Sequence, residues 1–408
     1  MLKLLRNKSF AILFSGQIVS TLGTNLFLLA LPWYVYIVTG SKADLAIVGF
    51  AQSLPGLAGL VAGVYVDRWN KRRTMIVADL LRGALSLLIG LIAIWRLSFL
   101  WIVVIVLLLQ LVGVFFGPAE SVLLPLVVGE EEIPAAMGIN QSGSATAQLA
   151  GQAGGGALLT ALGAPVLFLA NGVSFFVSVI SLLFVRAPEP PRVREPSTFL
   201  ADWKEGFAII GRSRMILLIV ASALVANFGL AAFDIALTAW IRGPLHDSAL
   251  WLGFIGAAFF VGVIVGGMLL GTVAKKLPLR AVLMSGLIIA GTLIGSVGAV
   301  RANWWAIAIL VLTGLAVGIL NGSVGAMAVQ VVPGPLRGRV FGLLGTLSTI
   351  ATPLGLAVYG ALMVVVPLPV LFILMGVVSV LAGLAFFLPI RDDLNNLGAA
   401  EAAPPVAQ

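Results

Sequence analysis

Long apolar runs fill this chain almost from end to end, and short charged, glycine- or proline-containing interruptions separate them. A helix that spans a bilayer needs about 20 mostly apolar residues. Cutting the chain at these interruptions predicts twelve such helices. Because most connections are short, helices adjacent in sequence should be antiparallel neighbours in space. The helices should begin near Phe10, Leu45, Thr74, Phe99, Pro134, Pro165, Met215, Leu250, Arg280, Asn303, Val340 and Pro367.

One break divides the pattern in the middle. Pro188, Pro190 and Pro191 lie in a segment that cannot form a spanning helix. Apolar residues then recur at helical spacing from Phe199 to Ile210, which indicates an amphipathic helix in the membrane interface. The predicted domains are a six-helix bundle over 1–186, a linker with this helix over 187–213, a second six-helix bundle over 214–391 and a disordered tail over 392–408.

The two predicted halves resemble each other. Aligning them places Gly63 on Gly267, whereas Asp67 corresponds to Gly271, so only the first half keeps the acid. Parallel repeats of this kind occur in secondary transporters.

Composition supports a membrane protein and excludes several other classes. Of 408 residues, 60% are hydrophobic and 10% are charged, whereas a soluble domain carries about 25% charged residues. The net charge of +8 does not indicate a nucleic-acid partner, because the cations lie in short loops without interleaved aromatic residues. With no cysteine and His246 as the one histidine, neither a metal centre nor another cofactor is expected.

The cations are distributed unequally between the two predicted membrane sides. Nineteen of 24 lie on the side of the N-terminus, four lie on the other side, and Arg82 lies within a helix. The side with more Lys and Arg in short loops is normally cytoplasmic. We therefore predict a multi-pass protein of a bacterial inner membrane with both termini in the cytoplasm. The first apolar run is longer than a signal-peptide core and is read as a retained helix.

The most informative connection covers residues 63–73. Gly63 should let two helices approach closely, and Asp67 should lie at the membrane edge. Asn70 should adopt the left-handed backbone of a sharp turn. A plain cytoplasmic loop remains an alternative interpretation of the charges alone. The cations of this segment are Arg68, Lys71, Arg72 and Arg73.

The order of residues in this segment resembles the loop 2–3 signature of the major facilitator superfamily, which usually has glycine where this chain has Asn70. Residues 78–82, 336–342 and 16–17 resemble the branch that contains macrolide-efflux proteins and siderophore exporters. Residues 151–156 resemble the glycine-rich helix-five motif of drug antiporters, with Gln152 in place of proline. The resemblance implies an all-α membrane fold with two pseudo-symmetric six-helix halves and alternating access around a central site. We also expect Asp67 to contact residues 338–342 when the cytoplasmic side is closed.

Ionisable residues inside membrane segments are expensive to bury and are therefore functional candidates. Asp79 and Arg82 are three residues apart and should pair on one helix face. Anchoring of the basic loop is favoured over substrate binding for this pair. The resemblance suggests that Glu120 bridges to the basic loop as a gate latch, and the alternative is a glutamate in interfacial water. These residues and those of the basic loop form the predicted gating motif.

Asp234 has no cation within one helical turn in sequence. It is the candidate for proton uptake or for attracting a cationic substrate, unless it faces a watery outer vestibule. Amide side chains are the other candidates for a central cavity, and the proton-relay arginine that many relatives have on helix four is absent. The amides are Gln17, Asn25, Gln110, Asn140, Gln141, Gln148, Asn171, Asn227 and Asn321.

These observations predict a monomeric exporter of amphipathic, drug-like small molecules that uses protons as the coupling ion and the lipid bilayer as its surroundings. A siderophore exporter or a lysophospholipid flippase on the same fold are alternatives. A non-transporting receptor or assembly partner is less favoured, because no sizeable soluble module is present. An enzyme is not expected, because no nucleophile–base pair or metal cluster is visible.

Overall fold

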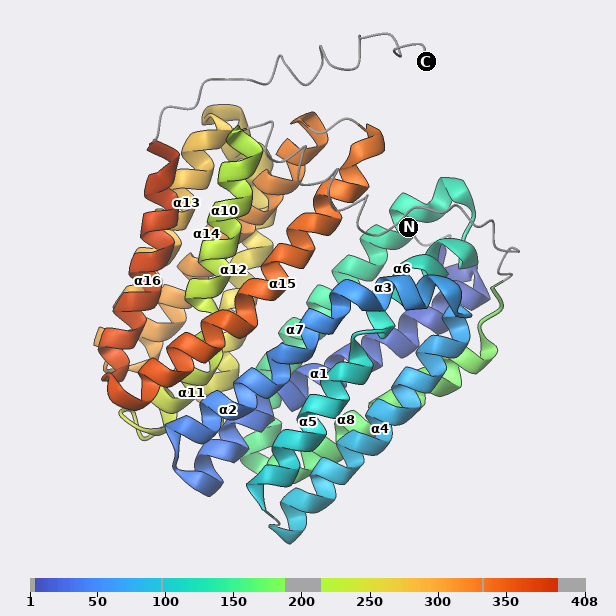
Figure 1. Ribbon diagram of the computed structural model, residues 1–408, viewed down its shortest axis with the longest axis horizontal. Helices are drawn as coiled ribbons and strands as arrows, with labels where there is room; N and C mark the ends of the chain where they lie inside the picture. The colour runs from blue at the N-terminus through green and yellow to red at the C-terminus, as the bar shows by residue number, and fades with distance from the viewer. Residues whose placement is uncertain (1–3, 97, 188–213, 332–333, 388–408) are drawn as a thin grey trace, which may run out of the picture.

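The computed structural model describes residues 4–96, 98–187, 214–331 and 334–387, and these ranges contain helices and connecting turns without a β-strand (Figure 1). The predicted linker helix and the predicted tail lie outside the described residues, so the domain boundaries stay a prediction. The first group of helices comprises α1 (Lys8–Thr39), α2 (Lys42–Ser53), α3 (Gly59–Arg68), α4 (Lys71–Trp95), α5 (Phe99–Gly113), α6 (Phe116–Val127), α7 (Ile133–Leu162) and α8 (Ala164–Phe184). The second comprises α10 (Arg214–Leu230), α11 (Phe233–Arg242), α12 (Ala249–Lys276), α13 (Leu279–Ser296), α14 (Asn303–Val331), α15 (Gly334–Val365) and α16 (Leu368–Leu384).

Nine segments of the described chain are long and apolar enough to cross a membrane. Three more helical segments lie beside them: α2 with α3, α7, and α15. The all-helical membrane fold is confirmed, whereas the count of twelve crossings stays a prediction. Most starts lie within three residues of the prediction, and α5 begins at Phe99 and α14 at Asn303, as predicted. Helix α15 begins at Gly334, six residues before the predicted Val340.

Helix ends follow from local sequence. Asn7 caps α1 by accepting a hydrogen bond from the Phe10 N–H at 3.2 Å, and Gly40 ends the helix in the left-handed region with φ 63°. The prediction for Asn70 is wrong. Its backbone is extended (φ −68°, ψ 117°), and its side chain accepts the Arg73 N–H at 2.8 Å as the N-cap of α4. The turn is made by helix capping, for which asparagine is preferred.

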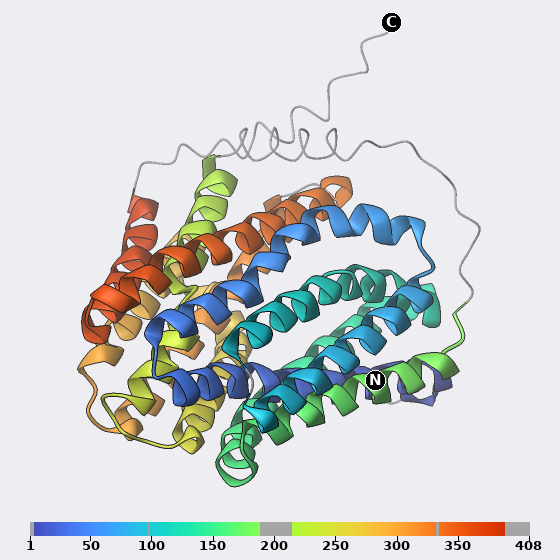
Figure 2. The ribbon, with the colours of Figure 1, turned by 60° about the horizontal axis from the view of Figure 1, so that its bottom comes forward.

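The two groups of helices repeat one packing pattern, as the predicted pseudo-symmetry requires. In the first group α4 packs on α8, α1 on α7 and α2 on α5. The equivalent contacts in the second group are α13 with α16, α10 with α15 and α12 with α14. Figures 1 and 2 show the groups side by side, the first coloured blue to green and the second yellow-green to red. The repeat read from sequence is therefore a structural repeat.

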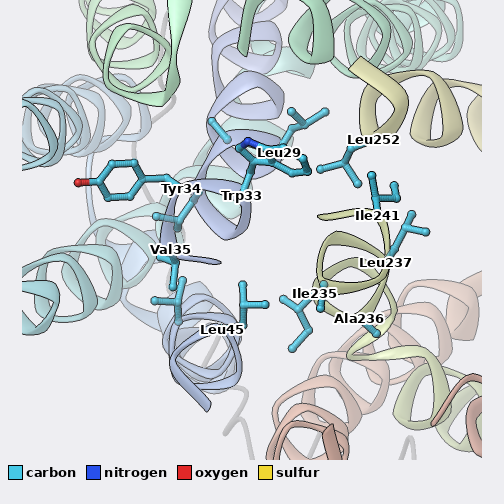
Figure 3. Packing of buried hydrophobic residues seen from close by; sticks show 14 of the residues in the cluster. Leu29, Trp33, Tyr34, Val35, Leu45, Ile235, Ala236, Leu237, Ile241 and Leu252 are labelled. Carbon is cyan, nitrogen blue, oxygen red and sulfur yellow. The ribbon is translucent and has the colours of Figure 1, made fainter. Parts of the chain in front are cut away.

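The groups meet at one end of the molecule and have separate cores at the other. We call the end with the turns at Gly40, Gly163 and Gly243 the distal end, and the end with Leu4 and Phe387 the terminal end. Figure 3 shows Leu29 of α1 near Leu252 of α12, and Leu45 of α2 near Ile235 of α11. These residues belong to one core that joins both groups. At the terminal end, one core around Met75 belongs to the first group and another around Leu283 to the second.

Helices α7 and α12 cross at the distal end with glycine on both sides. A Cβ on Gly253 would lie 2.6 Å from the Gln152 carbonyl oxygen and 2.7 Å from the Gly156 Cα. A Cβ on Gly156 would lie 2.7 Å from the Ala249 carbonyl oxygen. These neighbours are backbone atoms and cannot rotate away. Helices α2 and α15 form the other main contact between the groups.

We expect Gly253→Val to hold the distal contact open, because the new side chain would overlap the α7 backbone. Overpacking of this kind costs about 1–3 kcal/mol. Because the chain has no cysteine, spin labels at Leu162→Cys and Ser248→Cys can report the distance between the helix ends by pulsed electron paramagnetic resonance. The mean distance should increase in Gly253→Val. The control is Gly154→Val on α7, where a Cβ meets nothing within 4 Å. Equal distances in the two variants would contradict the expectation.

Candidate functional site

A central cavity of about 800 Å³ lies between the two groups of helices in the described part of the chain. This is the size of pockets that hold drug-sized ligands. The core that joins the groups closes the distal side, with Ile235, Leu237 and Leu252 belonging to both the core and the cavity wall. The first group contributes Gln17, Ser20, Thr21, Thr24, Asn25, Leu28, Leu29, Pro32, Gln52, Arg82, Phe116, Glu120, Gln148 and Gln152. The second group contributes Leu230, Phe233, Asp234, Ile235, Leu237, Thr238, Leu252, Gly256, Phe259, Phe260, Ile294, Leu310, Thr313 and Val317.

Arg82 and Asp79 form the predicted pair, with an Nη1–Oδ1 distance of 3.2 Å. The Asp79 side chain is fully buried, and the Arg82 guanidinium lies 4.1 Å from the ring centre of Phe175 and 5.6 Å from that of Phe116. Arg82 lines the cavity, whereas Asp79 lies behind it. The described contacts of Arg82 thus join α4 to α6 and α8 and not to the basic loop.

Glu120 lies on α6 and lines the cavity. Its carboxylate accepts a hydrogen bond from the Asn140 amide on α7 at 3.4 Å. Arg72 of the basic loop donates from Nε to the Leu182 carbonyl at 2.7 Å, at the end of α8. No ion pair from Glu120 to the basic loop is present among the described residues, so the predicted latch is not formed in this conformation. The predicted position in interfacial water is also replaced by a position in the cavity wall.

Asp234 is the second residue of α11, directly after the turn at Ala231 and Ala232 that separates α10 from α11. Its side chain is exposed to the cavity. Within the described ranges its carboxylate has neither a hydrogen bond nor an ion pair. Asp234 lies in the first turn of α11, where the helix dipole favours a negative charge by about 0.3–1 kcal/mol. The alternative of an outer vestibule does not fit, because the distal core lies between Asp234 and that end.

The predicted gating loop is only partly described. Lys71 is buried and its Nζ donates to the Trp69 carbonyl at 2.9 Å, while Arg68 and Arg73 are exposed. A Cβ on Gly63 would meet no atom of the described residues within 4 Å, so these residues show no close helix approach at this glycine. The side chains of Asp67 and residues 338–342 lie outside the described residues, so their contact stays a prediction.

The cavity prediction holds for three of the amides: Gln17, Asn25 and Gln148 line it. The others are corrected. Gln110 donates to the Gln52 carbonyl at 3.3 Å, and Asn171 is buried and donates to Ser86 at 3.0 Å, so both connect helices within the first group. Asn140 donates a hydrogen bond to the Glu120 carboxylate at 3.4 Å. The remaining amides are exposed and do not line the cavity: Gln141, Asn227 and Asn321.

Sequence reasoning missed much of the cavity wall. Ser20, Thr21 and Thr24 on α1 lie between Gln17 and Asn25 at helical spacing, so a polar stripe on an apolar helix was a readable signal. Gln152 follows Gln148 by one turn. The aromatic wall carries no such signal, because apolar residues face every direction in a membrane helix. Its members are Phe116, Phe233, Phe259 and Phe260.

Comparison with known proteins agrees with this architecture. A family model described as transmembrane secretion effector matches residues 2–406. Macrolide efflux protein A of Streptococcus pyogenes is 24% identical, over 85% of this chain and 87% of that protein. The multidrug efflux pump Tap of Mycobacterium tuberculosis is 26% identical, over 98% of each.

Solved structures show the same fold. A bacterial homologue of the human lysosomal transporter Spinster, in an inward-facing and unoccupied conformation, has a TM-score of 0.72 at 15% identity, with 98% of each chain covered. The transporter PepTSo of the POT family has a TM-score of 0.76 at 13% identity, covering 93% of this chain and 97% of that one. The chain belongs to the transmembrane secretion effector family of the major facilitator superfamily and is a multi-pass efflux transporter, not an enzyme.

Proposed function

We propose that this transporter exports amphipathic small molecules across a bacterial inner membrane by alternating access, with protons as the antiported ion. The observation that carries the proposal is one cavity between two helix groups whose joint core lies at one end only. Such a cavity can change the side to which it opens if the distal contacts part and the terminal ends approach.

The orientation follows from charge. The described cations of the terminal end include Arg6, Lys8 and the basic loop, while the distal end has Arg96 and Arg242 among its fewer cations. With the cation-rich side inward, both termini are cytoplasmic and the structure is open to the cytoplasm. We propose the monomer as the transporting unit, since both walls of the cavity are complete within a single chain.

Two features support the substrate class and the coupling ion. The cavity combines aromatic and aliphatic side chains with hydroxyl and amide groups, which suits a molecule with apolar and polar parts. Asp234 is a carboxylate without a cationic partner in the described chain. A proton can therefore neutralise it, or a cationic substrate can form an ion pair with it. The relatives named above are macrolide and multidrug efflux proteins.

The test is a susceptibility panel in an efflux-deficient bacterial host, with macrolides, other amphipathic drugs, siderophores and lysophospholipids. We expect increased resistance to amphipathic drugs and reduced drug accumulation that a protonophore restores. Gly253→Val, which we expect to hold the distal contact open, serves as the transport-deficient control when its level in the membrane matches that of the original protein. Protection confined to siderophores or lysophospholipids would favour those alternatives, and accumulation unaffected by a protonophore would remove proton antiport.

A further inference from the structure

The two walls of the central cavity differ in chemistry at the same depth. Gln152 of α7 and Gly256 of α12 lie at the same depth in the cavity, because the Gln152 Oε1 lies 2.7 Å from the position that a Cβ on Gly256 would occupy. One turn nearer the terminal end, α7 presents Gln148 and α12 presents Phe259 and Phe260. A Cβ on Gly151 would lie 2.7 Å from the Asn25 Cβ, which places α1 at this level too. The polar wall of α1 and α7 and the aromatic wall of α12 therefore adjoin each other along the α7–α12 contact and diverge from it toward the terminal end.

Unused hydrogen-bonding capacity in the first group lies mainly on α7 and at Gln52 of α2, since the α1 amides Gln17 and Asn25 already donate to Ser178 and to the Thr21 carbonyl. No hydrogen bond is present for the side-chain amides of Gln148 and Gln152 among the described residues. The Gln52 Nε2 is buried without a partner. On the wall of the second group, both threonine hydroxyls already bond to their own helices: Thr238 to the Asp234 carbonyl at 2.9 Å and Thr313 to the Ile309 carbonyl at 2.8 Å. Asp234 is the one charged side chain described on that wall.

We infer that the cavity binds a facially amphipathic ligand, a stiff scaffold with hydroxyl, ester or amide groups along one face and hydrocarbon along the other. Its polar face lies against α1 and α7, and its hydrocarbon face lies against α12 and α14. This inference rests on the proposed function and specifies its substrate class. A head-to-tail amphiphile would place its hydrocarbon chain against the free amides as well as against the phenylalanines. Buried polar groups left without partners are costly, so the cavity discriminates against that shape.

The test uses the full chain in phospholipid nanodiscs and two uncharged probes. Methyl cholate has its hydroxyl groups on one face, and decyl maltoside has a polar head and an apolar tail. We expect saturable binding of radiolabelled methyl cholate that an equal free concentration of decyl maltoside does not displace. Phe259→Ala should weaken binding about tenfold, the effect of losing an aromatic contact, and Gln148→Leu should weaken it about fivefold through a lost hydrogen bond.

Matched controls lie on the same two helices. Phe254→Ala on α12 and Gln141→Leu on α7 change exposed side chains that do not line the cavity, and both should bind methyl cholate within twofold of the original protein. Equal displacement by decyl maltoside, no saturable methyl cholate binding, or equal effects of Phe259→Ala and Phe254→Ala would overturn the inference. Drug export in the susceptibility panel together with any of these results would leave the proposed function intact.

Discussion

Replacing Asp234 by asparagine is expected to abolish proton-driven substrate accumulation while downhill substrate flux stays measurable. Coupled exchange requires a group at which proton and substrate occupancy exclude each other. Asp234 lines the cavity at the start of α11 and has no described partner that would hold its charge. Asparagine keeps the shape of the side chain and much of its hydrogen bonding, but it can neither take up a proton nor carry a negative charge.

The measurement uses proteoliposomes in which the cytoplasmic side of the transporter faces the outside. It compares substrate uptake with and without an imposed pH gradient. The matched control is Asp44→Asn, which changes a carboxylate in the first turn of α2 that does not line the cavity. This control should retain gradient-driven uptake. If Asp234→Asn also retains it, Asp234 is not the coupling group, and Glu120 becomes the next residue to replace because it is the other carboxylate in the cavity wall.

Much of the fold was readable from the apolar pattern, because membrane helices are long and their connections are charged. The start of α5 at Phe99 and the pairing of Asp79 with Arg82 follow from spacing alone. The interruptions within helices were not predicted. The turn between α10 and α11 falls at Ala231 and Ala232, where the sequence stays apolar and has no proline.

The cavity wall was harder to predict from sequence, because the depth of a residue in the membrane and the direction of its side chain depend on how the helices pack. Gln141 and Gln148 are both amides of α7, yet only Gln148 lines the cavity. Likewise, Glu120 has its described hydrogen bond with Asn140 on α7 and not with the basic loop. The sequence spacing within one helix does not determine which residue of another helix lies opposite. The glycine contact between α7 and α12 determines which residues of the two helices lie at the same depth.

The largest stability effect is expected at Arg82. Arg82→Gln would leave the fully buried Asp79 carboxylate without its cation, and breaking a buried pair from one side costs about 3–5 kcal/mol. We expect a marked fall in the yield of folded protein and in the melting temperature of the purified transporter. The exposed cation Arg96, at the distal end of the same helix, provides the control Arg96→Gln, which should have a small effect.

A second substitution separates charge from packing at this pair. Asp79→Asn combined with Arg82→Gln removes both charges, so most of the lost stability should return if the penalty comes from the unpaired carboxylate. If the stacking of Arg82 on Phe175 is what matters instead, the double variant should be as unstable as Arg82→Gln. Because residues in contact do not act additively, the coupling energy from this double-mutant cycle measures the ion pair itself. A coupling energy near zero would show that Asp79 and Arg82 contribute to stability independently.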